Sequence, residues 1–174
     1  MVSADPPLND LFQTHRQGLA GAVRSVLGPS ADVHEVLQDA FLKCWQDWQR
    51  GTRPSDPVAW IFVITWNAAK DTRRRRDRRP LHESLDEDTM PATQTHPSPS
   101  HALEQHEAIV RAHAAIAGLS DPEQQVFLLR VAGELTFEAV ATALAIPVGT
   151  AKTRMRQALL KLRSVLAGSE ETKS

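Results

Sequence analysis

The sequence predicts an all-α protein made of two small helical domains joined by a flexible acidic linker. In each half of the chain, apolar residues recur at spacings of three and four, which is the period of amphipathic α-helices. Between the halves, residues 80–102 contain four prolines, clustered acids and no lysine or arginine, a composition typical of disordered segments. The expected boundaries are a first domain at 1–79, the linker at 80–102, a second domain at 103–168 and a tail at 169–174.

Positive charge is concentrated in two stretches, although the 174 residues carry a formal net charge of only −1. Residues 70–79 read KDTRRRRDRR, and residues 147–163 contain no acid. The chain therefore consists of two basic lobes joined by an acidic segment. The single cysteine, Cys44, excludes an internal disulfide, and we find neither a signal peptide nor an apolar run long enough to cross a membrane. We expect a cytoplasmic protein with no membrane contact.

The first half of the chain predicts a packing helix over residues 8–27, ended by Gly28 and Pro29. A second helix is expected over residues 32–48. Its wide apolar stripe, expected to be buried, consists of Val33, Val36, Leu37, Ala40, Phe41, Cys44, Trp45 and Trp48. Its outward face carries Asp32, Glu35, Asp39, Lys43 and Gln46, with Gln38 at the margin. Taken alone, this is a solvated helix face.

A third helix is expected from residue 58 to about residue 76, after a loop at 49–57 in which Asp56 or Ser55 can cap it. Besides its core side, this helix has a stripe of mixed chemistry: Trp60, Val63, Asn67, Asp71, Arg74 and Arg78. An unstacked base offers both a π-face and a hydrogen-bonding edge, so this stripe suits partly single-stranded DNA. The alternatives are core packing for Trp60 and Trp66, and a solvated helix end for residues 73–76.

In the second half, a helix is expected over residues 103–117, and a capping box of Ser120 and Glu123 predicts another that ends near Gly133. A short helix capped by Thr136 follows, with one apolar face made of Phe137, Val140, Ala141 and Leu144. After a break at residues 145–147, the last helix has a stripe expected to be buried: Ala151, Met155, Ala158, Leu159, Leu162 and Leu166. This pattern predicts a helix-turn-helix.

The face of the last helix opposite this stripe is polar and basic. Thr150, Thr153 and Gln157 form its centre, flanked by Lys152, Arg154, Arg156, Lys161 and Arg163. Short hydrogen-bonding side chains suit base edges in the major groove, and cations suit phosphates. The alternative is an ordinary surface helix with solvated charges. The short capped helix and tight turn before it favour DNA binding.

Two independent blocks of the chain resemble bacterial sigma factors of the extracytoplasmic function (ECF) group. The second half contains LSDPEQQVFLLRVAGELTFEAVATALAIPVGTAKTRMRQALLKL, which resembles their domain for the minus-35 promoter element. The first half contains DVHEVLQDAFLKCWQDW and DPVAWIFVITWNAAKDTRRRRDRR, which look like their other domain, known as region 2. The resemblance implies a monomeric factor that binds core RNA polymerase and directs promoter-specific transcription initiation.

The resemblance also implies roles for particular residues. Docking on the clamp helices of the largest polymerase subunit is expected of Asp32, Glu35, Gln38 and Asp39. Contacts to the minus-10 element are expected of Gly51, Thr52, Arg53, Ser55, Asp56, Trp60, Asn67, Asp71, Arg73, Arg74, Arg75 and Arg76. Contacts to the minus-35 duplex are expected of Thr150, Lys152, Thr153, Arg154, Arg156 and Gln157. The second domain is expected to meet the polymerase flap, and an anti-sigma factor is expected to clamp the two domains.

Three positions depart from the family pattern. His34 stands where the family has an acid, Ala139 lacks the usual acid, and Ala145 replaces a glycine. The last change strains the turn by ~1 kcal/mol if the backbone there is left-handed.

We expect no enzyme activity and no cofactor, because no nucleophile, acid–base pair or phosphate-binding loop is present. A metal site is rejected because no cysteine accompanies the scattered histidines, His82, His96, His101, His106 and His113. Two other functions are open. A repressor or activator using only the second domain predicts operator binding without polymerase, and an adaptor that binds only protein predicts negligible DNA affinity.

Overall fold

The structure is a computed structural model that describes residues 8–29, 31–78 and 99–168 of the chain. All regular secondary structure in these residues is helical, which confirms the predicted all-α class. The first domain contains α1 (Leu8–Thr14), α2 (Arg16–Leu27), α3 (Val33–Gln49) and α4 (Pro57–Arg78). The second domain contains α5 (Pro99–Ala117), α6 (Asp121–Val131), α7 (Phe137–Leu144) and α8 (Val148–Gly168). Residues 80–98 of the predicted linker and the predicted tail lie outside the described residues.

The first helical segment is divided at His15, so the prediction of one helix over residues 8–27 was wrong. His15 has φ −98° and ψ 10°, away from helical values. On one side of the break, Phe12 of α1 meets Phe41 of α3 edge to face, with ring centroids 5.2 Å apart. At the break, the His15 ring lies 6.1 Å from that of Phe62 in α4. Because of this break, α1 packs against α3 while α2 packs along α4.

The central helix of the first domain is α4, because α2 and α3 both pack along it. Its buried side includes Ile61, Phe62 and Ala69. On the facing side of α3, Cys44 is buried, but Trp45 is 47% exposed, so its predicted burial was wrong. The neighbouring helices cover only one side of α3. Its apolar stripe extends beyond that side, so Trp45 at the edge of the stripe stays exposed to solvent.

The helices α5 and α8 of the second domain share a small core of Ala115, Leu119, Ala158 and Leu162. The helix α5 begins at Pro99, earlier than the predicted start at residue 103.

The predicted burial of two leucines in α8 was also wrong. Leu159 is 49% exposed and Leu166 is 41% exposed. The helices α5, α6 and α7 cover only part of the circumference of α8.

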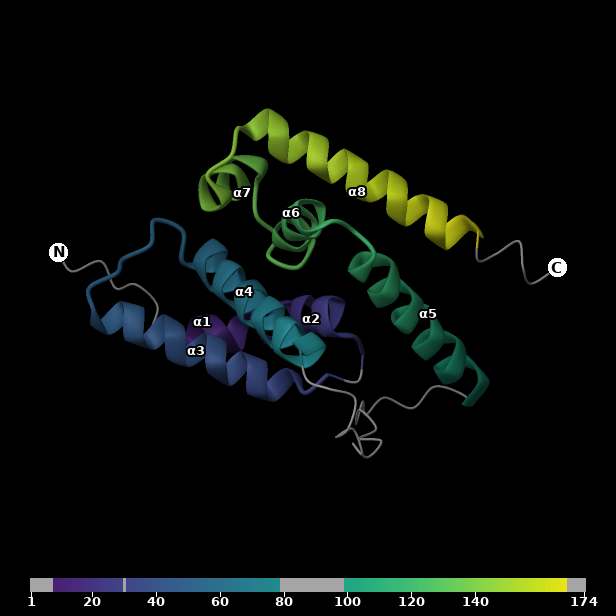
Figure 1. The fold of residues 1–174 in the computed structure, drawn as a ribbon, viewed down its shortest axis with the longest axis horizontal. Helices are drawn as coiled ribbons and strands as arrows, with labels where there is room; N and C mark the ends of the chain where they lie inside the picture. Colours follow the sequence, from purple (N-terminus) through teal and green to yellow (C-terminus); the bar gives the residue numbers. More distant parts are fainter. Residues whose placement is uncertain (1–7, 30, 79–98, 169–174) are drawn as a thin grey trace.

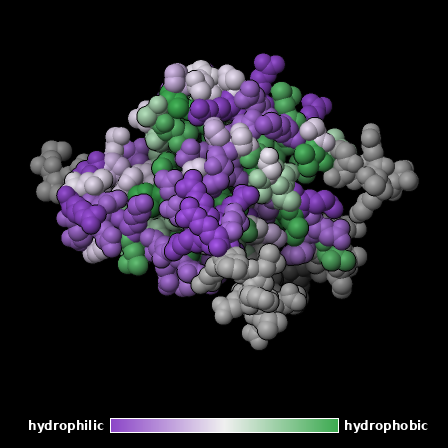
Figure 2. All heavy atoms as spheres, in the orientation of Figure 1, coloured by the Kyte–Doolittle hydropathy of each residue, from purple (hydrophilic) through white to green (hydrophobic). Residues whose placement is uncertain are grey.

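The two domains pack against each other, with α6 and α7 next to α4 and α5 next to α2 (Figure 1). Phe62 of α4 belongs to the same buried cluster as Leu129, Leu135 and Val140 of the second domain. The outer surface seen in this orientation is mainly hydrophilic, with separate apolar patches (Figure 2). The hydrophobic core is therefore continuous from one domain to the other.

Candidate nucleic-acid interface

The helix-turn-helix predicted from the sequence is formed by α7 and α8. Thr136 caps α7 as predicted, since its Oγ1 accepts a hydrogen bond from the Ala139 N–H at 3.1 Å. The helix ends at Ala145, which has the left-handed values φ 51° and ψ 46°. The Ile146 N–H then donates to the Ala141 carbonyl at 3.0 Å, which closes the turn. The left-handed backbone considered for Ala145 is therefore present.

The amino-terminal half of α8 presents a polar, cationic face to solvent. Lys152, Thr153, Arg156 and Gln157 are exposed, while Thr150 and Arg154 are half-buried at its edges. The Thr153 hydroxyl donates to the Gly149 carbonyl at 2.9 Å, which fixes its orientation on the helix. Exposed residues at these spacings lie on one side of a helix, so they can enter a groove together.

Lys161, predicted to flank this face, points toward α6 instead. Its Nζ lies 2.7 Å from Oε2 of Glu123, a side chain that is only 7% exposed. The same carboxylate oxygen accepts hydrogen bonds from the Ser120 N–H at 3.0 Å and from its hydroxyl at 2.7 Å. The hydrogen bond from Lys161, together with those from Ser120, lowers the pKa of Glu123. Lys161 therefore holds α8 on α6 and serves no groove face.

In the first domain, the loop before α4 is held by two of its own predicted DNA-binding residues. The Arg53 guanidinium donates to the carbonyls of Trp48 at 2.9 Å and Thr52 at 2.8 Å. It also lies 4.0 Å from the centroid of the Trp48 ring. Asp56 Oδ1 accepts the Ala59 N–H at 2.9 Å and so caps α4. Arg53 and Asp56 therefore shape the loop.

The remaining predicted loop residues, Gly51, Thr52 and Ser55, are exposed. Gly51 has φ 93°, a conformation that L side chains rarely adopt. Next to this loop, the Trp48 ring lies 6.5 Å from the ring of Trp60, tilted by 41°. Sequence reasoning assigned Trp48 to the core and missed it as a site residue. The available signal was a tryptophan in the last turn of a helix, three residues before Gly51.

The carboxyl-terminal end of α4 carries the predicted arginine cluster on an exposed surface. Arg74 pairs with Asp71 at 3.5 Å, so two predicted DNA-binding residues contact each other. Arg73 and Arg76 are exposed and make no hydrogen bond or ion pair with the residues that the structure describes. About two turns before Arg74, Asn67 is half-buried. The arginines at the carboxyl-terminal end of α4 are therefore exposed to solvent, whereas Asn67 in the middle of α4 is only partly accessible.

The predicted polymerase-docking residues lie at the start of α3. Asp32 caps this helix, since Oδ1 accepts the N–H groups of His34 at 3.0 Å and Glu35 at 3.2 Å. Glu35, Gln38 and Asp39 are exposed. The His34 ring nitrogen lies 3.1 Å from the Gln38 amide, so the family departure at His34 adds a local hydrogen bond.

Two large apolar side chains continue this face of α3 toward its carboxyl end. Leu42 is 54% exposed and Trp45 is 47% exposed. Exposed apolar groups beside a rim of polar ones are typical of protein–protein interfaces. Sequence reasoning missed both because helical spacing alone does not tell which side of a wide stripe is covered.

Two family models match the chain, one in each domain. The model described as Sigma-70 region 2 matches residues 11–79, and the model described as Sigma-70, region 4 matches residues 109–162. Both matches fall on the domains that carry the faces described above. The chain belongs to the sigma-70 family of RNA polymerase sigma factors. Its relatives further place this sigma factor in the ECF group.

Characterised relatives resemble the sigma factor over most of its length. It is 28% identical to the ECF RNA polymerase sigma factor RpoE of Cereibacter sphaeroides, covering 88% of this chain and 83% of the relative. It is 24% identical to the RNA polymerase sigma factor HrpL of Pseudomonas syringae, covering 92% of this chain and 88% of the relative.

Solved structures share the fold of the sigma factor. The structure of CnrH in complex with the cytosolic domain of CnrY has a TM-score of 0.65 at 24% identity, covering 92% of this chain and 88% of that one. RpoE from Bartonella quintana, bound to the anti-sigma factor NepR, has a TM-score of 0.64 at 23% identity, covering 91% and 96%.

No group of three or more histidine, cysteine or acidic side chains is placed to hold a metal ion within the parts of the chain that the structure describes. In the same parts, no helix combines the length and the apolar character needed to span a membrane.

Proposed function

We propose that this sigma factor docks on core RNA polymerase through α3, opens and reads the minus-10 element with the 51–57 loop and α4, and reads the minus-35 duplex with α8. One observation carries the proposal above the others. The chain has two separate cationic helix faces, one at the end of α4 and one at the start of α8, each beside groups that can read bases. The polymerase catalyses RNA synthesis, and the sigma factor itself catalyses no reaction.

In the minus-35 contact, the exposed cations and the exposed hydrogen-bonding groups of α8 have different tasks. Lys152 and Arg156 bind phosphates and set the position of the helix in the major groove. Gln157 reads a base edge, for which its amide supplies both a donor and an acceptor. Thr153 uses its hydroxyl on the Gly149 carbonyl, so its methyl group meets the DNA.

In the minus-10 contact, an unstacked base lies against the loop between α3 and α4. Trp48 and Trp60 supply aromatic surface there, and Gly51, Thr52 and Ser55 supply accessible backbone and hydroxyl groups. Along α4, Asn67 reads a second exposed base edge. Exposed arginines at 73, 74 and 76 bind the phosphates of the opened strand.

In the polymerase contact, Glu35, Gln38 and Asp39 form a polar rim around the exposed apolar pair Leu42 and Trp45. This face fits the clamp helices of the largest subunit, and the outward side of the second domain fits the flap. Because a solved structure of the same fold is a complex with an anti-sigma factor, we also propose such an inhibitor for this chain. Because these partners are cytoplasmic, we propose that the sigma factor acts in the cytoplasm.

Transcription with purified core polymerase on a DNA library randomised at both promoter elements tests this proposal. The wild-type factor is expected to enrich two short sequences about two helical turns apart among the templates that yield RNA. Asn67→Ala should weaken selection at the downstream element only, and Gln157→Ala at the upstream element only. The exposed Gln105, on α5 and outside every proposed face, supplies the matched control variant Gln105→Ala.

Different results of this experiment would contradict different parts of the proposal. RNA that starts with the same sequence preference as with core polymerase alone would overturn the sigma-factor role in full. Selection that weakens at both elements with either variant would overturn the assignment of one reading face to each element. Binding to DNA without polymerase as a symmetric dimer would instead favour a repressor that uses only the second domain.

A further inference from the structure

One aromatic ring lies where the helices α6, α7 and α8 of the second domain come together. Phe137 is the first residue of α7 and is half-buried. The guanidinium carbon of Arg130, on α6, lies 4.6 Å from the centroid of its ring, and Nζ of Lys152, on α8, lies 5.9 Å from the same centroid. Both distances are within the range at which an aromatic face attracts a cation. The ring of Phe137 therefore contacts a cation from each neighbouring helix.

The Arg130 side of this contact is fixed by the fold. Besides facing the ring, the Arg130 guanidinium donates a hydrogen bond to the Leu135 carbonyl, in the turn between α6 and α7. The Leu135 N–H donates to the Leu129 carbonyl at 3.2 Å, which ties the same turn to the last turn of α6. The side chains of Leu135 and Leu129 are both buried. Phe137 thus has a rigid support behind it.

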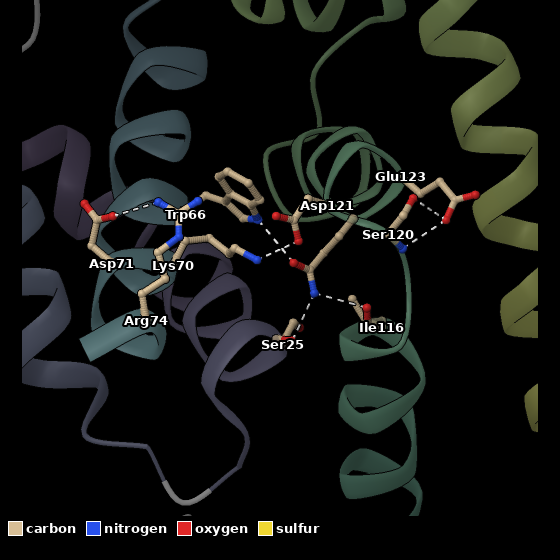
Figure 3. Close-up of polar contacts among 10 residues, drawn as sticks. Ser25, Trp66, Lys70, Asp71, Arg74, Ile116, Ser120, Asp121 and Glu123 are labelled. Carbon is tan, nitrogen blue, oxygen red and sulfur yellow. Dashed lines mark hydrogen bonds and ion pairs between the residues drawn. The ribbon is translucent and has the colours of Figure 1, made fainter. Parts of the chain in front are cut away.

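The Lys152 side of the contact contains no acid. Lys152 is exposed, and its amine makes no hydrogen bond or ion pair with the residues that the structure describes. Two other lysines are paired with carboxylates. Lys70 Nζ lies 2.6 Å from Asp121 Oδ1, as Figure 3 shows, and Lys161 Nζ lies 2.7 Å from Glu123 Oε2. The ring is therefore the contact that orients Lys152.

An aromatic ring orients a lysine without neutralising it. A carboxylate competes with an incoming phosphate for the same ammonium group, whereas a ring leaves its N–H donors available. A lysine side chain also loses much rotamer freedom when it binds, and a contact that orients it beforehand reduces this cost. No acid occurs between Pro147 and Arg163, so the charge of Lys152 is not cancelled along α8 either.

We propose that Phe137 is a positioning residue for recognition of the minus-35 element. Its ring, supported by Arg130, keeps the Lys152 ammonium at the edge of the α8 face, where a phosphate of the duplex binds. Phe137 itself does not touch the DNA and acts through Lys152. This inference rests on the proposed function, since Lys152 contacts a phosphate only if α8 enters the major groove.

A double-mutant cycle on Phe137 and Lys152 tests the proposal. Wild type, Phe137→Leu, Lys152→Met and the double variant are each assembled with core polymerase and titrated on a promoter duplex selected from the randomised library. With Lys152 present, Phe137→Leu should weaken DNA binding about two- to fivefold, the effect of one cation–π contact at an exposed site. In the Lys152→Met background, Phe137→Leu should have no effect. A ring that acts only by packing would weaken binding equally in both backgrounds.

The salt dependence of binding supplies a readout that a purely structural role would not change. Lys152→Met should reduce the slope of log affinity against log salt by about 0.9, the value for one phosphate contact. Phe137→Leu should reduce the slope in the same direction, because a lysine without its ring engages the phosphate in fewer complexes. Phe137→Tyr retains an aromatic face and should restore both the slope and the affinity.

Phe127 of α6 provides the matched control. It is also half-buried, and it packs against the core of Ala158 and Leu162 between α6 and α8. Among the described residues no cation lies over its ring. Phe127→Leu should therefore leave the salt slope unchanged, and any loss of affinity should be the same with Lys152 and with Met at that position. Thermal unfolding shows how far each phenylalanine variant is destabilised.

Equal weakening by Phe137→Leu in the two backgrounds would overturn the positioning role, and so would a salt slope equal to that of wild type. Phe137→Met, which fills the space with a flexible side chain, repeats the cycle if Phe137→Leu does not fold. The proposed function fails in a different way. If Lys152→Met changed neither the affinity nor the slope, α8 would not bind a phosphate through this residue, and the proposed minus-35 contact would be wrong.

Discussion

Arg75 Nη2 on α4 lies 3.8 Å from Asp39 Oδ2 on α3, so a minus-10 contact predicted from the sequence is paired with a proposed polymerase contact. Arg75 also donates to the Thr72 hydroxyl at 3.2 Å. The side chains of Arg75 and Asp39 are 67% and 49% exposed, and ion pairs this accessible contribute little to stability. The pair therefore orients the two side chains in the free protein, and either one can leave the pair to bind promoter DNA or core polymerase.

Asp39→Ala should change the free energy of unfolding by less than about 0.5 kcal/mol. It should weaken binding to core polymerase by about tenfold, the loss expected for one well-placed interface residue. Urea denaturation and a binding titration with core polymerase measure the two effects. The exposed acid Asp77, in neither proposed interface, gives the control Asp77→Ala. A large loss of stability without loss of polymerase binding would show that the pair is structural.

Ala145 adopts a left-handed backbone in the turn between α7 and α8, where an L side chain is strained. Ala145→Gly should therefore stabilise the protein by about 0.5–1 kcal/mol, which is the strain removed less the extra flexibility of glycine in the unfolded chain. Chemical denaturation measures the change. Ala108, exposed in the middle of α5, gives the opposite control: Ala108→Gly should destabilise by about 1 kcal/mol. If both substitutions changed the free energy of unfolding in the same direction, this explanation of the turn would be contradicted.

Local patterns in the sequence were enough to predict much of this structure. The Thr136 cap and the apolar face of α7 depend on nearby residues of the same helix. The left-handed turn at Ala145 was considered only as a condition, because the resembled family has glycine there. The Ser120 and Glu123 contact is equally local. Such features are decided by the chain's own neighbours, so spacing and residue type reveal them.

Features decided by distant parts of the chain were not predicted. Gln124 has the sequence context of a solvated helix residue, and its burial depends on helices α2 and α4 of the other domain. Trp45 and Leu159 lie in apolar stripes wider than the surfaces that cover them. Helical spacing identifies an apolar side chain, but it does not distinguish a core neighbour from an external partner.

The buried carboxylate of Glu123 joins α6 to α8 through Lys161. Because this hydrogen bond lowers the pKa of Glu123, the carboxylate contributes stability above its unfolded pKa near 4.5, and the contribution is lost as pH falls through the lower folded pKa. Lys161→Met should cost about 1–3 kcal/mol at neutral pH, since it leaves a buried carboxylate without its cation. Denaturation between pH 3 and pH 7 measures both effects. Glu123→Gln should flatten this pH dependence, and an unchanged slope would refute the assignment.

Cys44 is fully buried where α3 faces α4, and burial raises the pKa of its thiol to about 12. A thiol reagent at pH 8 should therefore label native protein only as fast as the first domain opens, because reaction requires an accessible thiolate. Mass spectrometry follows labelling with time, and urea should accelerate it steeply. Ser164→Cys, on the exposed side of α8, supplies a fast-reacting control. Rapid native labelling at both cysteines would mean that α3 is not packed on α4.

His113 of α5 lies in the contact between domains, near Arg24 of α2. Burial and then the charge of Arg24 lower the pKa of His113 below its usual 6.5, and its Nδ1 has no hydrogen-bond partner among the described residues. The folded contact therefore favours the neutral ring, so its contribution is complete above about pH 6.5 and is lost as pH falls below that value. We expect the contact between the two domains to open progressively under mild acid.

Scattering of the free factor from pH 7.5 to pH 5.5 measures this opening. The radius of gyration should increase below about pH 6.5 in wild type and stay constant in His113→Leu, which has no ring to protonate. His106, exposed on the same helix, gives the matched control His106→Leu, which should follow wild type. An opening that persists in His113→Leu would assign the pH response to another group. With His113 neutral, its ring and the Arg24 guanidinium do not repel each other, so protonation of His113 is the step that weakens the contact between the domains.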